Sequence, residues 1–338
     1  MDGPLPECIS TEEKQEKLAG DLVASHFHQR PTSIKLASVQ GTSSITFEVI
    51  LEDGTSQIIQ LRTEPLDITP IITARQLLGS SAPNIEPISD PKLASESVFA
   101  FCMDRMPGNS WLEIEGSWKP DALLECSTSL GRLLSHCFVS RDEGAIATYI
   151  QPTLRKILMM PNRSEVDVSS YFPLVEELIT ASPQLNELPG FFSHLDLNPM
   201  NVFVEDTGIV RGIIDWEESR TLPFGICGWG IHFLAGEFLT VDTGEIEFTE
   251  RPIYEEMETR FWKALLENAS SEAKMELEGK MSLVQLAVIT GTILRVLGIY
   301  TVNGIETQYN HFISTIRANK IVPVFVFAFL YSFRNSTR

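Results

Sequence analysis

Residues 192–217 read FSHLDLNPMNVFVEDTGIVRGIIDWE, and this stretch decides the fold. It places His194, Asp196 and Asn201 in the spacing His-x-Asp-x-x-x-x-Asn, and it ends just after Asp215. Between Asn201 and Asp215, two short apolar runs flank the turn sequence Asp-Thr-Gly, which predicts a β-hairpin. Each residue by itself is ordinary turn or strand-end chemistry. All four in this order predict a functional loop followed by a hairpin.

These four side chains suit phosphoryl transfer. The reaction needs a carboxylate to position and deprotonate the attacking hydroxyl or amine, and oxygen ligands that hold Mg²⁺ against the phosphates. Asp196 on the loop would be the base. Asn201 and Asp215, which the hairpin brings to one end, would be the metal ligands. The residues therefore predict a magnesium-dependent phosphotransferase site.

Upstream of this stretch, the sequence predicts a small part built on a sheet. Ser10 and Glu13 fit a capping box at the start of a helix. Asp53-Gly54 is a strong hairpin signal between two alternating runs. The predicted elements are a helix over 11–28, strands within 34–62, a helix over 68–79 and a strand over 98–103.

From residue 120 onward the pattern is mostly helical. The predicted helices are 121–137, 171–181, about 252–280 and 282–300. A small sheet-containing part followed by a larger helical part predicts an α+β protein. We assign 1–103 to the first lobe, 104–110 to a connector around Pro107-Gly108, and 111–338 to the helical lobe.

The charge balance argues against one class of partner. The 338 residues include 45 acidic and 26 basic side chains, for a formal net charge of −19. Such a chain repels phosphate backbones, so we expect no nucleic-acid partner. The acidity favours a cationic substrate, or it only keeps the protein dispersed in water.

Cysteine usage and apolar runs bear on the compartment. The five cysteines form no CxxC pair, which disfavours a disulfide framework or a zinc cluster. The first residues lack a signal-peptide pattern. The longest apolar run, Ile321–Phe333, is shorter than the roughly 20 residues that a membrane span needs. We expect a cytoplasmic protein without a membrane partner, in which this run packs on the core or mediates contacts between subunits.

The motifs resemble those of a known superfamily. HLDLNPMN at 194–201, followed by GIIDWEES at 212–219, is similar to the HxDxxxxN and I-D-W/F motifs of the aminoglycoside phosphotransferases and choline kinase-like proteins. The continuation through 222–225, Trp229 and 234–236 looks most like fungal members. The resemblance implies a protein-kinase-like, two-lobed α+β fold, with ATP and Mg²⁺ as cofactors and a small-molecule acceptor.

The resemblance also implies roles for the loop residues. Asp196 would be the catalytic base, and Asn201 and Asp215 would bind magnesium. His194 would hold the loop by hydrogen bonds. Leu195 departs from the glycine that is common at its position.

The nucleotide site of the superfamily lies between the lobes. Backbone groups of the connector would meet adenine, and the loop before the second strand would cover the phosphates. The residues implied are Arg62, Gly41, Ser43, Ser44, Met103, Asp104 and Met106. Because this loop has one glycine, a plain β-turn is an equal interpretation of it.

Two departures concern this nucleotide site. Arg62 stands where kinases carry lysine, and the two cations are not interchangeable. The helix that follows, over 69–76, has no acidic residue to pair with that cation, although Glu64 and Asp67 lie in the preceding loop. The ATP site is therefore either rewired or degraded.

The acceptor pocket is expected in the helical lobe. Glu217, Trp229 and Glu237 are its candidate residues. Further glutamates after residue 237 favour a cationic acceptor or a solvated helix face.

Three functions fit these observations. The first is a small-molecule kinase. The second is a pseudokinase-like binding protein, for which Arg62 and the missing helix acid argue. The third is a secondary-metabolism enzyme that uses the same cleft for non-kinase chemistry.

Overall fold

The computed structural model of the chain describes residues 5–38, 40, 44–114, 116, 118–159, 168–240 and 246–303. They divide into two compact units. Unit 1 comprises Met1–Pro107 and Gly212–Glu217, and unit 2 comprises Gly108–Arg211 and Glu218–Arg338. The return of 212–217 to the first unit was not expected from the sequence, which suggested a single connector at 104–110.

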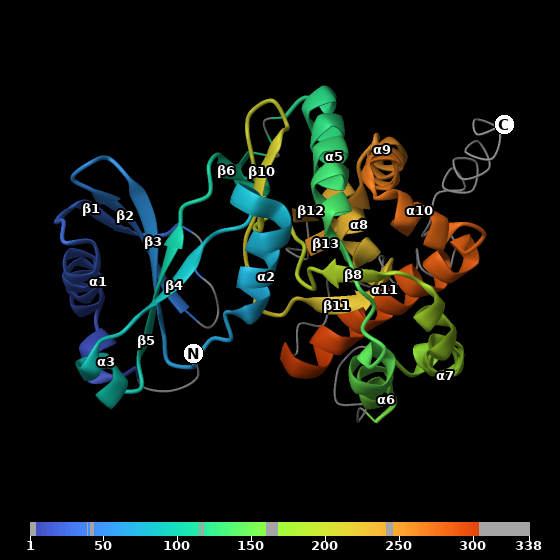
Figure 1. Cartoon of the computed structure of the whole chain (residues 1–338), viewed down its shortest axis with the longest axis horizontal. Helices are drawn as coiled ribbons and strands as arrows, with labels where there is room; N and C mark the ends of the chain where they lie inside the picture. The colour runs from blue at the N-terminus through green and yellow to red at the C-terminus, as the bar shows by residue number, and fades with distance from the viewer. Residues whose placement is uncertain are drawn as a thin grey trace. The chain divides into compact units, whose positions relative to one another are not determined.

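Unit 1 is an antiparallel sheet with helices (Figure 1). The strand order is β1-β2-β3-β5-β4. Its strands are β1 (Pro31–Leu36), β2 (Ser44–Leu51), β3 (Ser56–Arg62), β4 (Ile85–Ile88) and β5 (Phe99–Asp104). Its helices are α1 (Glu12–Phe27), α2 (Thr69–Leu78) and α3 (Pro91–Ser95). The predicted turn at Asp53-Gly54 joins β2 to β3, with Gly54 at φ 84°.

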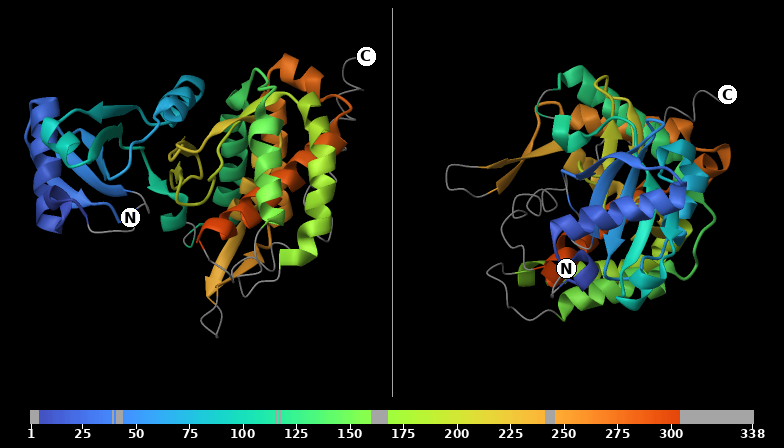
Figure 2. Two further views of the ribbon diagram at one scale, coloured as in Figure 1. Left: turned by 90° about the horizontal axis from the view of Figure 1, so that it is seen from below. Right: turned by 90° about the vertical axis from the view of Figure 1, so that its left-hand side faces the viewer.

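The core of unit 1 lies between the sheet and two of its helices. In β2, alternate residues such as Phe47 and Val49 face this core, as the period of a strand requires. Leu22 and Val23 of α1 and Leu93 of α3 pack against them. Figures 1 and 2 show α1 lying along the sheet. The alternation in the sequence therefore selects the face that α1 covers.

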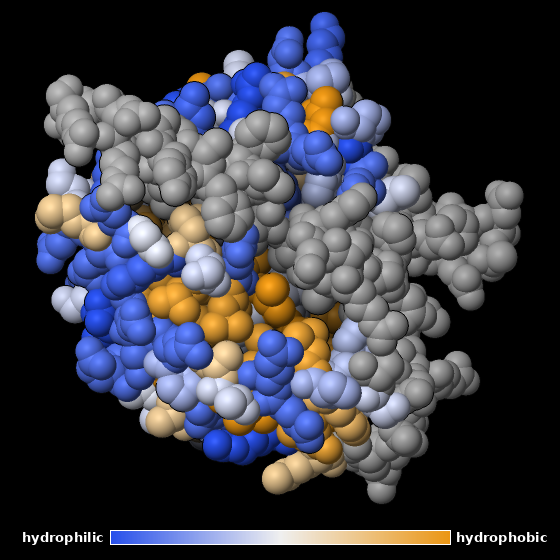
Figure 3. Space-filling view, turned by 90° about the vertical axis from the view of Figure 1, so that its right-hand side faces the viewer, coloured by the Kyte–Doolittle hydropathy of each residue, from blue (hydrophilic) through white to orange (hydrophobic). Residues whose placement is uncertain are grey.

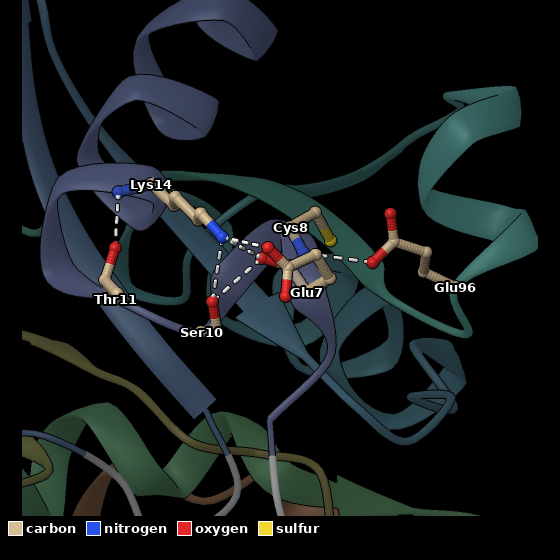
Figure 4. A network of polar contacts seen from close by, with 6 residues as sticks. All are labelled: Glu7, Cys8, Ser10, Thr11, Lys14 and Glu96. Carbon is tan, nitrogen blue, oxygen red and sulfur yellow. Dashed lines mark hydrogen bonds and ion pairs between the residues drawn. The ribbon is translucent and has the colours of Figure 1, made fainter.

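The start of α1 differs from the predicted capping box. Thr11 is the N-cap, and its Oγ1 accepts the backbone N–H of Lys14 at 3.3 Å. Ser10 instead donates its hydroxyl to the carbonyl of Glu7 (Figure 4). The helix begins one residue later because Ser10 still belongs to the end of the short 3-10 turn that precedes it.

Unit 2 is mostly helical. Its helices are α4 (Trp111–Ile114), α5 (Pro120–Leu134), α6 (Gln151–Leu158), α7 (Phe172–Ala181), α8 (Trp229–Ala235), α9 (Tyr254–Asn268), α10 (Ser271–Leu277) and α11 (Met281–Asn303). A π-helical segment, η5 (Ile146–Ile150), runs directly into α6. The 3-10 turns of the two units are η1 (Glu7–Ile9), η2 (Gly79–Ser81), η4 (Ser135–Cys137), η6 (Val168–Tyr171), η7 (Ser182–Glu187) and η8 (Ile226–Gly228).

Short strands complete this part of the chain. They are β6 (Asn109–Ser110), β7 (Phe138–Val139), β8 (Gly190–Ser193), β9 (Val202–Val204), β10 (Val210–Ile213), β11 (Arg220–Pro223), β12 (Gly236–Thr240) and β13 (Ile246–Glu250). They form the sheets β10-β9-β6, β11-β8-β7 and β12-β13. The hairpin predicted after Asn201 is therefore present as β9 and β10, whereas β12 and β13 were not predicted.

Two glycines let the helices of unit 2 approach closely. A Cβ at Gly131 of α5 would lie 2.2 Å from the carbonyl oxygen of Phe261 in α9. A Cβ at Gly291 of α11 would lie 1.7 Å from the carbonyl oxygen of Ile226 in η8. Because backbone atoms cannot move aside as a side chain can, only glycine fits at these two contacts.

Other predictions met mixed outcomes. The helix predicted over about 252–280 is two helices, because the Ser270 side chain caps α10 by accepting the Ala273 N–H. The apolar run Ile321–Phe333 lies outside the described residues. Within the described ranges, no single helix is long and apolar enough to cross a membrane, and α10 with the first part of α11 passes that test only as a pair bent by 93°.

Polar residues cover most of the described surface in the view of Figure 3, with apolar residues gathered near its middle. Among the described residues, Arg62 and Glu258 are the buried Asp, Glu, Lys or Arg side chains. The other charged residues whose burial the structure describes are at least partly exposed to water. A buried charge is costly without a partner, so these two positions call for an explanation.

Candidate functional site

The loop 194–201 is held by its own side chains. It follows the fully buried strand β8. The backbone N–H of Asp196 donates to His194 Nδ1 at 3.1 Å. Asn201 Nδ2 donates to the Asp196 carbonyl at 2.8 Å and to its Oδ2 at 3.3 Å. His194 and Asn201 are buried, whereas the Asp196 side chain is 29% exposed. The loop thus presents one partly exposed carboxylate on a fixed backbone.

Packing from α8 supports this loop. A Cβ at Gly230 would meet the side chain of Leu197 at 2.8 Å, so α8 lies directly against the loop. Deeper in unit 2, His232 of α8 forms an ion pair with Glu258 of α9, and its Nδ1 lies 2.5 Å from the Tyr254 hydroxyl. Burial and the charge of Glu258 raise the pKa of Tyr254. This buried cluster accounts for Glu258 and fixes α8 on α9.

Arg295 is the main residue that sequence reasoning missed. Its Nη2 forms an ion pair with Asp196 Oδ1, and its guanidinium carbon lies 5.0 Å from the centre of the Trp229 ring. It belongs to α11, one turn after Gly291, and so shares the face that packs on η8. The sequence did contain a signal for Arg295. It is the one charged residue between 281 and 303, and a lone charge in an apolar helix needs a partner.

In unit 1, Arg62 has an acidic partner after all. Its Nη1 donates to Glu217 Oε2 at 2.7 Å. Gln60 accepts from the same nitrogen at 3.4 Å and donates to Ser44 Oγ at 3.0 Å. The Arg62 side chain is 9% exposed and that of Glu217 is 29% exposed. Ser44, Gln60, Arg62 and Glu217 thus form one polar chain across β2, β3 and the returning segment 212–217.

The acidic partner of Arg62 is Glu217 and not a residue of α2. α2 contains no acidic residue. Asp67 instead accepts the Thr69 N–H at 2.9 Å near the start of α2, and hydrogen bonds from the Thr69 side chain and N–H lower the pKa of Asp67. The Glu217 carboxylate lies on Arg62, and its predicted contact with substrate stays a prediction. Whether the ATP site is rewired or degraded stays a prediction.

Arg62 also has capacity for an anion. Its Nε is buried and has no hydrogen-bond partner among the described residues. A buried donor of this kind is normally satisfied, and a phosphate oxygen would satisfy it with a charge-assisted bond. The nucleotide that the resemblance implies therefore fits the donors present at Arg62.

Asp215 lies two residues before Glu217, in unit 1. Its side chain is exposed and its backbone has φ 64°. Non-glycine residues at positive φ are uncommon, and aspartate is among those that tolerate it. Trp216, fully buried, donates its Nε1–H to the Ile213 carbonyl at 2.7 Å and anchors the segment. In unit 2, the bonds of Asn201 engage its amide nitrogen, so its Oδ1 is the atom suited to a cation.

The expected connector residues have structural partners. The Asp104 N–H donates to the Asn84 carbonyl at 3.2 Å, and its carboxylate accepts the Asn84 N–H at 3.1 Å. Met103 is part of β5, between β3 and β4. Met106 is buried, and its carbonyl accepts from Arg105 at 3.0 Å. Adenine contacts by these residues stay a prediction.

The remaining candidate residues belong to the expected phosphate-covering loop and the expected acceptor pocket. Gly41 and Ser43 lie outside the described residues, whereas Ser44 begins β2 and is buried. Glu237 is in β12, opposite Thr249, and its side chain is not described. Trp229 is the one acceptor-pocket candidate with a described contact near Asp196, through Arg295.

Comparison with known proteins bears on the fold. No family model matches the chain, and no curated protein matches its sequence. An ethanolamine kinase of Plasmodium vivax matches with a TM-score of 0.57 and 13% identity, over 93% of this chain and 89% of that one. An amicoumacin kinase in complex with AMP-PNP, Ca²⁺ and Ami matches with a TM-score of 0.55 and 13% identity, over 93% and 98%.

A macrolide 2'-phosphotransferase type I matches with a TM-score of 0.52 and 11% identity, again over 93% of this chain and 98% of that one. These solved neighbours are small-molecule kinases. The chain therefore has the α+β, kinase-like fold of these solved small-molecule kinases, an antiparallel sheet followed by a mostly helical part, as its HxDxxxxN and I-D-W motifs indicated.

Proposed function

We propose that this chain is an ATP- and Mg²⁺-dependent phosphotransferase that acts on a hydroxyl or amine of a small molecule. The observation that carries the proposal is the loop 194–201, in which Asn201 and His194 hold the backbone at Asp196 and leave its carboxylate partly exposed. The same fold in solved small-molecule kinases supports it.

Asp196 is the proposed proton acceptor. An ionised carboxylate has about four lone-pair sites. Arg295 and Asn201 use one on each oxygen, so either oxygen can still accept the proton of an acceptor group. Fixing Asp196 from two sides orients the base before the acceptor arrives, which lowers the entropy cost of the reaction.

Other residues would bind the cofactors. ATP, when bound, supplies the phosphoryl group. Arg62 would bind a phosphate through its unpartnered Nε, and Glu217 would keep the guanidinium in place. The oxygens of Asn201 and Asp215 are hard ligands of the kind that Mg²⁺ prefers. The buried Nε of Arg62, which has no hydrogen-bond partner among the described residues, favours the kinase over the pseudokinase alternative, because a bound phosphate would satisfy it.

Nucleotide binding and turnover test this proposal. We expect ATP with Mg²⁺ to raise the melting temperature of the wild type, by mass action. Asp215→Ala should lose that rise. Asp196→Asn should keep the rise and lose at least about 100-fold in acceptor-dependent ADP release, as expected when a general base is removed.

Asp206→Asn is the matched control, since it removes an exposed carboxylate in the turn between β9 and β10. It should behave as the wild type in both assays. If ATP with Mg²⁺ leaves the melting temperature of the wild type unchanged, the phosphotransferase proposal is wrong and the pseudokinase alternative gains.

A further inference from the structure

Two arginines of unit 2 lie over aromatic rings near the catalytic loop. Arg295 lies over Trp229, with 5.0 Å between the guanidinium carbon and the ring centre. Arg220 lies over Tyr149, at 4.1 Å. A guanidinium that stacks on a ring keeps its N–H groups in the plane, where they can bind a planar anion in a bidentate way.

Strand pairing places Arg220 beside the loop. In the β8–β11 ladder, Arg220 is the register partner of Ser193, which immediately precedes His194. The Arg220 side chain is exposed. Tyr149, beneath it, belongs to the π-helical segment η5, a type of distortion that is frequent at functional sites.

The Tyr149 hydroxyl lies within the influence of both arginines. Burial raises its pKa, while the positive charges of Arg220 and Arg295 lower it and the charge of Glu218 raises it. Arg220 lies over the Tyr149 ring, and Arg295 pairs with Asp196, so both arginines belong to the surroundings of the loop 194–201. This local set of charges differs from the acidic balance of the whole chain.

Arg295 has donors to spare. A guanidinium carries five N–H groups, and its bond to Asp196 uses Nη2. A second anion could therefore bind Arg295 while Asp196 stays in place, or could draw Arg295 partly away and expose Oδ1. In either case, an anionic group on the acceptor would bring its neighbouring hydroxyl or amine to the base.

We infer that the acceptor carries an anionic group, a carboxylate or a phosphate, which Arg295 and Arg220 bind beside Asp196. This inference rests on the proposed phosphotransferase function and names its substrate class. It differs from the cationic acceptor that the net charge of −19 favoured. Charges within a few ångströms outweigh distant surface charges, which salt screens beyond about 8 Å at physiological ionic strength.

A matched set of acceptors tests the inference. The probes are glycerate for the carboxylate, glycerol 3-phosphate for the phosphate, glycerol as the neutral equivalent, and ethanolamine and choline as cations. ADP release in the presence of each would give kcat/KM. We expect glycerate or glycerol 3-phosphate to exceed glycerol by at least about tenfold, and which of the two is better identifies the anion.

Variants separate specificity from general damage. Arg295→Gln should reduce kcat/KM for the preferred anion by roughly 10- to 100-fold, the range for losing a charged hydrogen bond. Because Arg295 also holds Asp196, kcat should fall for every acceptor, whereas KM should rise for the anion alone, and Arg295→Lys should restore part of that KM. Arg220→Gln, at an exposed position, should raise KM for the anion by several-fold. Arg260→Gln, which breaks an exposed pair with Glu256 on α9, is the control and should change nothing.

Binding without turnover keeps the two proposals distinguishable. Glycerate and glycerol 3-phosphate would also be titrated calorimetrically into the wild type and Arg295→Gln without nucleotide. If ATP with Mg²⁺ binds and turns over but ethanolamine or choline is preferred, or Arg295→Gln leaves the preference unchanged, the inference is wrong and the phosphotransferase proposal stands. If the anions bind through Arg295 while ATP does not bind, the anion site is real and the proposed function fails.

Discussion

Replacing Glu217 with glutamine tests whether it substitutes for the missing helix acid. The change removes the negative charge from a pair whose atoms are 2.7 Å apart, while the new amide oxygen can still accept a neutral hydrogen bond from Arg62. Removing one partner of a fully buried ion pair costs about 3–5 kcal/mol. Glu217 is 29% exposed, so water offsets part of the loss. We expect the free energy of unfolding of unit 1 to fall by about 2–3 kcal/mol.

A double-mutant cycle isolates the pair. Arg62→Met, Glu217→Gln and the double variant should show a coupling energy of about 2 kcal/mol, within the range for residues in contact. Native-state hydrogen exchange of the β3 amides would measure the opening of unit 1 by itself. Glu64→Gln is the control, because Glu64 is exposed and the ion pair described for Arg62 is with Glu217. A coupling energy below about 0.5 kcal/mol would refute the idea that Glu217 replaces the missing helix acid. An equal loss of stability in Glu64→Gln would refute it as well.

Three further changes have defined outcomes. Gly291→Ala places a Cβ 1.7 Å from the Ile226 carbonyl oxygen, so we expect a loss of about 3 kcal/mol or more in urea unfolding, and lower acceptor-dependent activity because α11 carries Arg295. Thr11→Ala removes the N-cap of α1 and should lower the free energy of unfolding by about 1 kcal/mol, measured in the same way. Thr63→Ala is the control, because Thr63 is not the N-cap of a described helix. Burial raises the pKa of Cys102 to about 12, with smaller contributions from nearby carboxylates. The unfolded thiol has a pKa of about 8.5, so its contribution to stability is complete below that pH and is lost as pH rises towards 12. Between pH 7.5 and 10 the wild type should lose about 2 kcal/mol more than Cys102→Ala, and parallel pH profiles would contradict this.

Burial also raises the pKa of a second cysteine, Cys8, near the N-terminus. The Cys8 N–H donates to Glu96 at 3.0 Å (Figure 4), and burial together with Glu96 raises the pKa of its thiol to about 11. Because the thiolate is the reactive form, we expect slow alkylation of Cys8 by iodoacetamide at pH 7.5 and a rise in rate towards pH 11. Rapid labelling of this residue at neutral pH, identified by peptide mapping, would contradict the expectation.

Local features of the protein were determined by contiguous residues. The turn at Asp53-Gly54, the alternation in β2 and the spacing from His194 to Asn201 each act within one turn, strand or loop. Propensity and periodicity therefore predicted these elements, and the motif predicted the fold. The predicted helix boundaries were wrong where a single side-chain capping bond decided them, as at Thr11 and Ser270.

Tertiary structure alone decided the partners of the charged groups. Arg62 and Glu217 are 155 residues apart, and Asp196 and Arg295 are 99 residues apart. No periodicity or motif in the sequence predicts either pair. Each pair forms because the sheet, the returning segment 212–217 and α11 bring distant residues together. A partly buried charge must find a partner wherever the fold provides one. The sequence by itself determined the loop 194–201, and packing determined that Glu217 pairs with Arg62 and that Arg295 pairs with Asp196.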